Sequence, residues 1–289
     1  MSGLKQWIAP LLDLCDDAGV LIRRHYHNAQ TTQVSYKIDQ SPVTQADLDA
    51  HDVLVAGLAT LTPKLPILSE ESSATQYDKR HNWQRFWLLD PLDGTREFIA
   101  RTGDFSVNIA LIDAHKSVLG VLYLPLQNVA YVGVSGERAQ LWDLGSDAEP
   151  RDLCARALAD QLVICGSRQG ACPQTQQRFM RWCKTQKPEL DVLSSGGAMK
   201  FCQLADGVAD CYPRYLPCCE WDVAAGQALL EAAGGCVVDM QGVPLRYNTR
   251  ESLYSPHFLA IADPAAPLWR TFAREHGWST FAALESRTG

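Results

Sequence analysis

The sequence predicts an α/β protein, with an antiparallel sheet in the first half and alternating strands and helices in the second. The first half contains consecutive β-branched and apolar runs, separated only by Asp, Gly and Pro punctuation, at 106–112, 118–123, 129–134 and 139–142. Such runs are typical of an antiparallel sheet. In the second half, apolar runs alternate with helical segments, which favours a layered α/β arrangement. These apolar runs lie at 162–165, 208–212, 236–239 and 258–262.

Two helices are expected before the antiparallel sheet. Residues 3–27 carry apolar side chains at helical spacing, with acids between them, which predicts an amphipathic helix packed on the core. Thr44 or Ser41 is a start signal for a second helix that runs through Leu58.

Short strands at 66–69 and 86–89 should end at Glu70-Glu71 and at Asp90, and a polar loop is expected over 72–84. A short helix is expected over 94–99. The remaining helices are predicted at 173–186, 197–206, 222–233 and 267–276. The polar segment 143–152 is the best candidate boundary between two subdomains.

The composition is that of a soluble globular protein. Hydrophobic residues make up 46% and charged residues 20% of the 289 residues. A net charge of −7 gives no support to a nucleic acid polymer as partner. No apolar stretch is long enough to span a bilayer. The 10 cysteines show no metal-binding spacing and are expected to be buried, reduced thiols of a cytoplasmic protein. Peripheral contact of the first helix with the inner membrane stays open.

Carboxylates stand at four places where a strand ends or a helix begins: Asp47, Glu70-Glu71, Asp90 with Asp93, and Asp222. Carboxylates brought together repel one another unless cations hold them. Hard oxygen ligands select magnesium, manganese or calcium over zinc. The pattern therefore indicates a metal site.

The segment Asp90-Pro91-Leu92-Asp93-Gly94-Thr95 is the most specific signal. Asp90 and Asp93 can face one ion, with the Leu92 carbonyl as a third oxygen. Gly94 lets the backbone approach a ligand closely. Thr95 opens a helix, whose free N–H groups can receive a phosphate. The alternative is a capped turn with incidental aspartates.

These elements resemble the signatures of the inositol monophosphatase superfamily. Asp90–Thr95 is similar to the first signature, and Trp221–Gly226 followed by Gly234-Gly235 is similar to the second. Segments 42–47 and 69–71 match in the expected order, so the resemblance spans roughly residues 40–263. It implies a layered αβαβα sandwich with the site between two halves. Residues 1–145 would carry most metal ligands, and residues 146–289 would carry substrate specificity.

The resemblance also implies a role for each position. Two or three Mg²⁺ ions would be bound by Glu70, Asp90, the Leu92 carbonyl, Asp93 and Asp222. Asp47 and Thr95 would activate the attacking water, with Glu70 as a further catalytic group. Gly94 and Thr95 would hold the phosphate through backbone N–H groups. Glu71 is either a direct member of the site or a supporting acid.

Within the superfamily, several runs are most similar to the 3'(2'),5'-bisphosphate nucleotidases. These runs are residues 90–100, 200–202, 212–214 and 248–252. The resemblance implies removal of the 3'(2')-phosphate from adenosine 3',5'-bisphosphate or its sulfated form. Lys200 and Arg214 would bind the second phosphate. Tyr212 or Tyr215 is a candidate for stacking on the base, although packing is the simpler role for both.

Gly196-Gly197-Ala198-Met199-Lys200 departs from that branch, because a pair of serines is expected before the lysine. Ser194 or Ser195 could substitute for them. This departure keeps an inositol or sugar monophosphatase open as the alternative. A non-catalytic phosphate binder is disfavoured because every metal and water-activating position is filled. A homodimer and a role for Cys218 and Cys219 also stay open.

Overall fold

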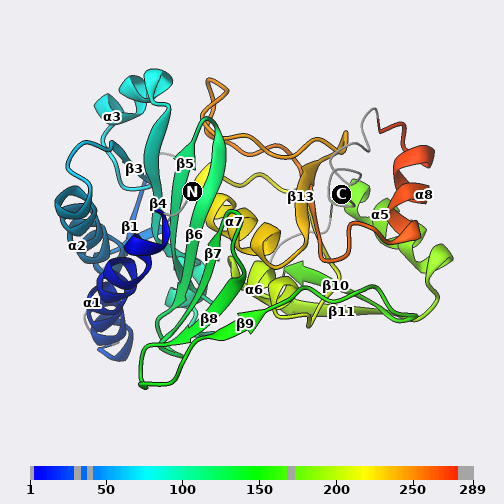
Figure 1. Cartoon of the computed structure of the whole chain (residues 1–289), viewed down its shortest axis with the longest axis horizontal. Coiled ribbons are helices and arrows are strands. Elements are labelled where there is room, and N and C mark those ends of the chain that lie inside the picture. The colour runs from blue at the N-terminus through cyan, green and yellow to red at the C-terminus, as the bar shows by residue number, and fades with distance from the viewer. Residues whose placement is uncertain (1–2, 29–33, 38–41, 168–172, 279–289) are drawn as a thin grey trace.

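The computed structural model describes residues 3–28, 34–37, 42–167 and 173–278. They form five layers in the order helix, sheet, helix, sheet, helix, which run from left to right in Figure 1. The predicted α/β class and the αβαβα sandwich are therefore confirmed.

The first layer consists of η1 (Lys5–Trp7), α1 (Ile8–His27) and α2 (Gln45–Leu61). The stripe on α1 that was predicted to pack on the core is buried: it comprises Leu11, Leu12, Cys15, Ala18 and Ile22. Thr44 caps α2, since its hydroxyl accepts from the Ala46 N–H and its own N–H donates to Asp47. Ser41, the other predicted start, lies outside the described residues. A short hairpin of β1 (Val34–Tyr36) and β2 (Pro42–Thr44) precedes α2 and was not predicted.

The second layer is a seven-stranded sheet in the order β3-β4-β5-β6-β7-β8-β9. Only β3 and β4 are parallel to each other, whereas the other neighbours are antiparallel. Its strands are β3 (Ile67–Ser69), β4 (Arg85–Asp93), β5 (Ser106–Asp113), β6 (Lys116–Leu124), β7 (Val129–Val134), β8 (Ala139–Asp143) and β9 (Arg151–Leu153). The division at residue 145 stays a prediction, and β9 continues the first sheet beyond it.

The middle layer contains α6 (Met199–Ala205) and α7 (Ala224–Ala232), with η4 (Glu220–Asp222) directly before α7. Close approach of α7 to the sheet depends on two glycines. A Cβ on Gly120 would lie 2.3 Å from the Ala225 carbonyl oxygen, and a Cβ on Gly133 would lie 2.3 Å from the Leu229 Cα. Contacts this short leave no room for any side chain, so both positions require glycine.

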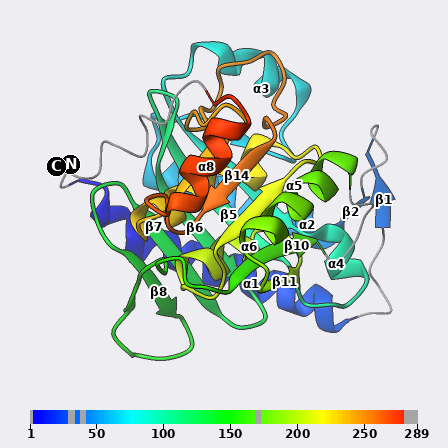
Figure 2. The same cartoon turned by 90° about the vertical axis from the view of Figure 1, so that its right-hand side faces the viewer.

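The fourth layer is a five-stranded sheet in the order β11-β10-β12-β14-β13. Its strands are β10 (Leu162–Ser167), β11 (Leu190–Ser195), β12 (Cys211–Arg214), β13 (Cys236–Asp239) and β14 (Phe258–Ile261). The outer helices α5 (Gln174–Gln186) and α8 (Pro267–Glu275) cover it, and Figure 2 shows both in front of these strands. Phe179, Trp269 and Phe272 fill the core between them.

The prediction of a polar loop over 72–84 is wrong. This segment contains α3 (Ala74–Lys79) and η3 (Arg80–Asn82). Arg80 is only 2% exposed. Its guanidinium donates to the Asn248 side chain at 2.6 Å, to the Arg250 carbonyl at 3.0 Å and to the Glu251 carbonyl. Because Arg80 binds a distant loop instead of water, polarity alone gave the wrong prediction here.

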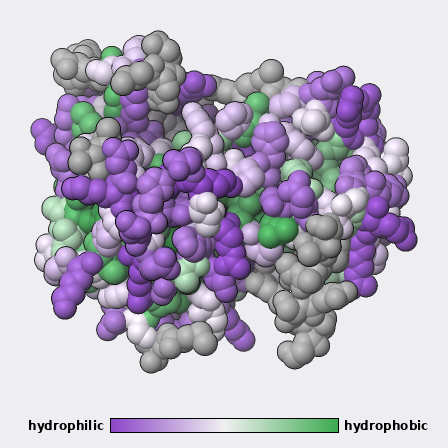
Figure 3. All heavy atoms as spheres, turned by 90° about the horizontal axis from the view of Figure 1, so that it is seen from above, coloured by the Kyte–Doolittle hydropathy of each residue, from purple (hydrophilic) through white to green (hydrophobic). Residues whose placement is uncertain are grey.

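The surface seen in Figure 3 is mostly hydrophilic, with apolar side chains in small groups. In the part of the chain that the structure describes, no helix is both long and apolar enough to cross a membrane. The nine described cysteines are free, and seven of them are buried, as predicted. Cys172 lies outside the described residues.

Candidate active site

Glu70 and Asp90 meet because β3 and β4 run parallel. Ser69 lies opposite Leu89 in the sheet, and the Glu70 N–H donates to the Leu89 carbonyl at 3.0 Å. Each acid is the next residue after this pair, so both side chains emerge at the same sheet edge.

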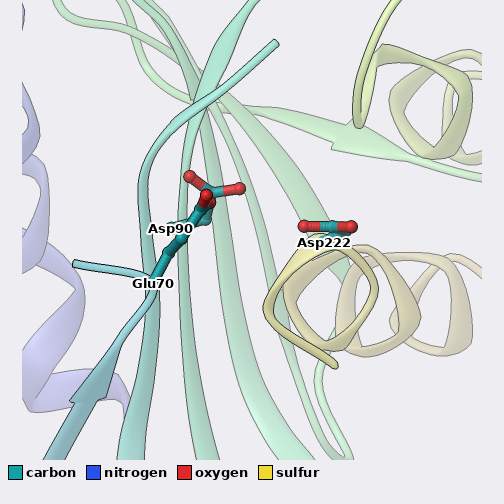
Figure 4. A group of neighbouring side chains, drawn as sticks. All are labelled: Glu70, Asp90 and Asp222. Carbon is teal, nitrogen blue, oxygen red and sulfur yellow. The ribbon is translucent and has the colours of Figure 1, made fainter. Parts of the chain in front are cut away.

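Asp222 reaches the same place from the middle layer. It ends η4, where its carboxylate accepts from the Cys219 N–H at 2.8 Å. One oxygen each from Glu70, Asp90 and Asp222 lies within 4.8 Å of the others. Figure 4 shows Glu70 and Asp90 on adjacent segments, with Asp222 facing them from the helical side.

This cluster is electrostatically unfavourable without a cation. Burial, followed by repulsion from Glu70 and other acids, raises the pKa of Asp90 well above its usual value. Burial and repulsion from Asp93 and Glu70 do the same to the pKa of Asp222. Buried charges of one sign need a counter-charge. Three converging carboxylates are the oxygen donors that a hard divalent cation prefers, so the residues fit such an ion.

Asp93 and Leu92 complete the predicted set. The pairing of β4 with β5 shifts register between Asp90 and Asp93. The Asp93 carboxylate accepts from the Asn108 amide at 3.3 Å, and burial raises its pKa although Lys200 opposes this. The Leu92 carbonyl accepts from the Thr95 hydroxyl at 3.3 Å. Gly94, which follows Asp93, has a φ of 98°, in the left-handed region that favours glycine.

Asp47 and Thr95 form the pair that the resemblance implies. The Thr95 hydroxyl donates to Asp47 Oδ1 at 2.9 Å. Thr44 donates to the other oxygen, Oδ2, from its N–H at 2.8 Å and from its hydroxyl at 2.6 Å. Burial raises the pKa of Asp47 despite these hydrogen bonds. The carboxylate is therefore fixed in place and is a stronger base than an exposed aspartate.

Lys37 is a member of the site that the sequence did not indicate. Its Nζ lies 2.7 Å from Glu70 and 2.5 Å from Glu71. Burial opposes its charge, but the two glutamates raise its pKa above the ordinary value. Glu71 thus touches Lys37 and is not part of the three-carboxylate cluster. Lys37 follows β1 in a polar stretch without periodicity, so no pattern marked it.

Two adjoining cavities define the site. The acidic cavity, of about 550 Å³, contains the carboxylate cluster with Thr95, Lys37 and Tyr254 among its lining residues. The basic cavity, of about 390 Å³, contains Lys200 and Arg214. Their shared wall consists of Asp93, Gly94, Arg96, Glu97, Pro217, Cys218 and Asp222.

Lys200 and Arg214 both donate to backbone carbonyls in the basic cavity. Lys200 is 2% exposed, and its ammonium group donates to the Gly197 carbonyl at 3.0 Å. Burial lowers its pKa, which Asp93 opposes. Arg214 donates to the Leu216 and Pro217 carbonyls at 3.1 and 3.0 Å. An ammonium group has three N–H donors and a guanidinium group has five, so both side chains keep donor capacity for a ligand.

The tyrosines are unsuited to stack on a base. Tyr212 is 6% exposed, packs edge-on against Phe201 and Phe258, and has Lys200 Nζ 5.1 Å from its ring centre. Tyr215 packs against Phe179 in the outer core. Packing, the simpler of the two roles considered, is the one both residues have.

Ser195 and two neighbouring cysteines line the two cavities. Ser195, a candidate substitute for the expected serines, lines the basic cavity. Its hydroxyl hydrogen is already used, because it donates to the Gln203 side chain at 3.0 Å. Cys218 and Cys219 line the acidic cavity. Burial, with Asp222 nearby, raises the pKa of Cys218 to about 12, so its thiol stays protonated near neutral pH.

The chain matches known proteins along most of its length. The profile of the Inositol monophosphatase family matches residues 4–269. The chain is 43% identical over 245 residues to the 3'(2'),5'-bisphosphate nucleotidase CysQ of Escherichia coli O157:H7, a match that covers 85% of this chain and 95% of that protein. It is 35% identical over 260 residues to CysQ of Buchnera aphidicola, covering 89% and 94%.

Solved structures agree with these matches. The crystal structure of CysQ from Bacteroides thetaiotaomicron, described as a bacterial member of the inositol monophosphatase family, superposes with a TM-score of 0.77 at 33% identity. The superposition covers 91% of this chain and 99% of that one. The family profile, the sequence relatives and the solved structure all point to the same family, so the resemblance seen in the motifs is confirmed. This chain belongs to the inositol monophosphatase family.

Proposed function

We propose that this chain is a magnesium-dependent phosphomonoesterase that removes the 3'(2')-phosphate of adenosine 3',5'-bisphosphate or its sulfated form. Relatives at 35–43% identity are named 3'(2'),5'-bisphosphate nucleotidases. The observation that carries the proposal is the acidic cavity beside a basic one. A substrate with two phosphate groups has a partner for each cavity, whereas a monophosphate leaves Lys200 and Arg214 without one.

The metal ligands in this proposal are Glu70, Asp90, the Leu92 carbonyl, Asp93 and Asp222, which would hold two or three Mg²⁺ ions. Ions of this kind neutralise phosphate charge and make a water molecule nucleophilic near neutral pH. The chain itself supplies the fixed carboxylates, and Lys37 offsets part of their charge at Glu70.

Asp47 and Thr95 handle the proton of the attacking water. Because the Thr95 hydroxyl donates to Asp47, its oxygen is oriented to accept a hydrogen from water. The water oxygen bonds to phosphorus as the ester P–O bond breaks. One proton of the water passes through Thr95 to Asp47, and the departing ribose oxygen takes up a proton from solvent. Backbone N–H groups of Gly94 and Thr95 hold the phosphate, at a helix start that no side chain caps.

A cytoplasmic location belongs to the same proposal, since the nine free thiols of the described residues suit a reducing compartment. Homodimer formation and peripheral contact with the inner membrane stay predictions from the sequence.

The substrate is tested by comparing adenosine 3',5'-bisphosphate with inositol 1-phosphate in the presence of Mg²⁺. We expect kcat/KM to be higher for the nucleotide by about 10- to 100-fold, the value of one or two charge-assisted hydrogen bonds. Equal or faster turnover of inositol 1-phosphate would instead support the monophosphatase.

Lys200→Met should lower kcat/KM for adenosine 3',5'-bisphosphate by about 10- to 100-fold, because the second phosphate loses a buried charged donor. Adenosine 3'-monophosphate lacks that phosphate and should lose less than about 3-fold. Lys184→Met, at an exposed position on α5, is the matched control. Arg214→Ala should show the same contrast, and equal losses on both substrates would remove the proposed contact.

Thr95→Val should lower kcat by about 10²-fold or more, because the valine cannot relay a proton to Asp47. Thr95→Ser keeps the hydroxyl and should retain most of the activity. Steady-state kinetics of the three proteins at saturating substrate check this. A valine variant with a kcat close to that of the wild type would exclude the relay.

A further inference from the structure

Glu97 has no part in the proposed mechanism, yet it stands between the two cavities. It lies in the first turn of α4 (Thr95–Ile99), directly after the phosphate-binding segment, and lines both the acidic and the basic cavity. Its charge contributes to raising the pKa of Asp93 and opposes the lowering of the pKa of Lys200. The negative charge of Glu97 therefore acts on a group in each cavity.

The Glu97 carboxylate also has no hydrogen-bond or ion-pair partner among the described residues. Its backbone carbonyl accepts from Thr102. Across residues 3–28, 34–37, 42–167 and 173–278, the side chain makes no hydrogen bond or ion pair. A carboxylate at a cavity wall with no donor from the described residues is an acceptor that a bound ligand can use.

Gly196 and Gly197, in the segment before Lys200 where a pair of serines was expected, bear on this position. A Cβ on Gly196 would lie 3.0 Å from Glu97 Cγ and 2.7 Å from Asp104 Cβ. The Gly196 N–H is already used, since it donates to Asp104 at 3.1 Å. Residues 196 and 197 thus bring no side-chain hydroxyl to this wall and leave its space to Glu97.

We infer that Glu97 is a specificity-determining residue that accepts a hydrogen bond from the ribose hydroxyl next to the scissile phosphate. This rests on the proposed function. With one phosphate in each cavity, the sugar crosses the shared wall, and its free hydroxyl is the donor available there. That hydroxyl is present whether the ester is at the 3' or the 2' position, so the contact serves both.

The assignment is tested with adenosine 3',5'-bisphosphate and its 2'-deoxy analogue, which lacks only this hydroxyl. The wild-type enzyme should prefer the ribonucleotide in kcat/KM by about 10- to 100-fold, the usual value of a hydrogen bond to a charged group. Glu97→Met, of similar length, should lower the preference below about 3-fold. Glu97→Gln keeps an uncharged acceptor and should fall between them.

Glu189→Met, which removes an exposed acid that lines neither cavity, is the control and should keep the wild-type preference. Calorimetric Kd values for adenosine 5'-monophosphate and its 2'-deoxy form should rank the proteins in the same way. The preference for the ribose form should be largest in the wild type, smaller in Glu97→Gln and smallest in Glu97→Met. Equal turnover of both bisphosphates by the wild type overturns this assignment alone, as does an unchanged preference in Glu97→Met. Absence of turnover on both, with turnover of inositol 1-phosphate, overturns the proposed function itself.

Discussion

Replacing Asp90 by asparagine is expected to lower kcat/KM by more than about 10³-fold, a loss of about 4 kcal/mol of transition-state stabilisation. Asp90 is 1% exposed and has an oxygen within 4.8 Å of Glu70 and Asp222 in the carboxylate cluster. Asparagine has nearly the same shape but offers a neutral oxygen, so a divalent cation loses both charge and affinity. The Leu92 N–H, which donates to Asp90 at 3.0 Å, can still donate to the amide oxygen.

Stability should change in the opposite direction. A carboxylate whose pKa is raised by folding costs the folded state free energy once the pH exceeds its unfolded value of about 3.9. At neutral pH without metal, Asp90→Asn removes that cost. Its thermal unfolding temperature should therefore equal or exceed that of the metal-free wild type.

Thermal unfolding with and without Mg²⁺ separates the two effects. Mg²⁺ should raise the unfolding temperature of the wild type, because a ligand that binds only the folded state stabilises it. The shift should be largely absent in Asp90→Asn. Asp78→Asn, an exposed acid on α3, should behave as the wild type. Full activity of the Asp90 variant would contradict the metal-ligand assignment.

Overpacking a core usually costs about 1–3 kcal/mol, and Gly133→Val is expected to lower the free energy of unfolding by more than that. The added Cβ would lie 2.3 Å from the Leu229 Cα and 2.5 Å from the Ala228 carbonyl oxygen. These are backbone atoms of α7, so no rotamer change relieves the clash. The helix must move away from the sheet.

Displacement of α7 would also move Asp222, which ends the turn before this helix. We therefore expect Gly133→Val to lose both stability and activity, measured by chemical denaturation and by turnover. Gly145→Ala is a control, because its Cβ would meet only the ends of two side chains, Asp143 at 3.3 Å and Asn128 at 3.7 Å. A Gly133→Val protein with wild-type stability would show that the close packing of α7 is dispensable.

The carboxylate cluster was predictable because strand ends and helix starts carry the acids. Glu70 and Asp90 each follow an apolar run, and the parallel pairing of those runs brings the two acids together. The hydrogen bond from Thr95 to Asp47 was implied by the family resemblance, since the two residues are 48 positions apart.

Other features had no local signal. Lys37 enters the site from a hairpin of three-residue strands, which is too short for a periodic pattern. Arg80 is buried through contacts with residues more than 160 positions away, which composition cannot reveal. Tyr212 lies in a strand near the cations, and only its packed neighbours exclude it as a stacking surface.

Asp222, the cluster residue that the middle layer contributes, lies far later in the chain than the other acids, and this matters for biosynthesis. Glu70, Asp90 and Asp93 leave the ribosome well before residue 222, and until then the seven-stranded sheet lacks the helix that covers one of its faces. A nascent or truncated chain thus has neither a complete ligand set nor a closed core. The three-carboxylate cluster is therefore complete only once the chain has been made through residue 222 and η4 has packed beside the first sheet.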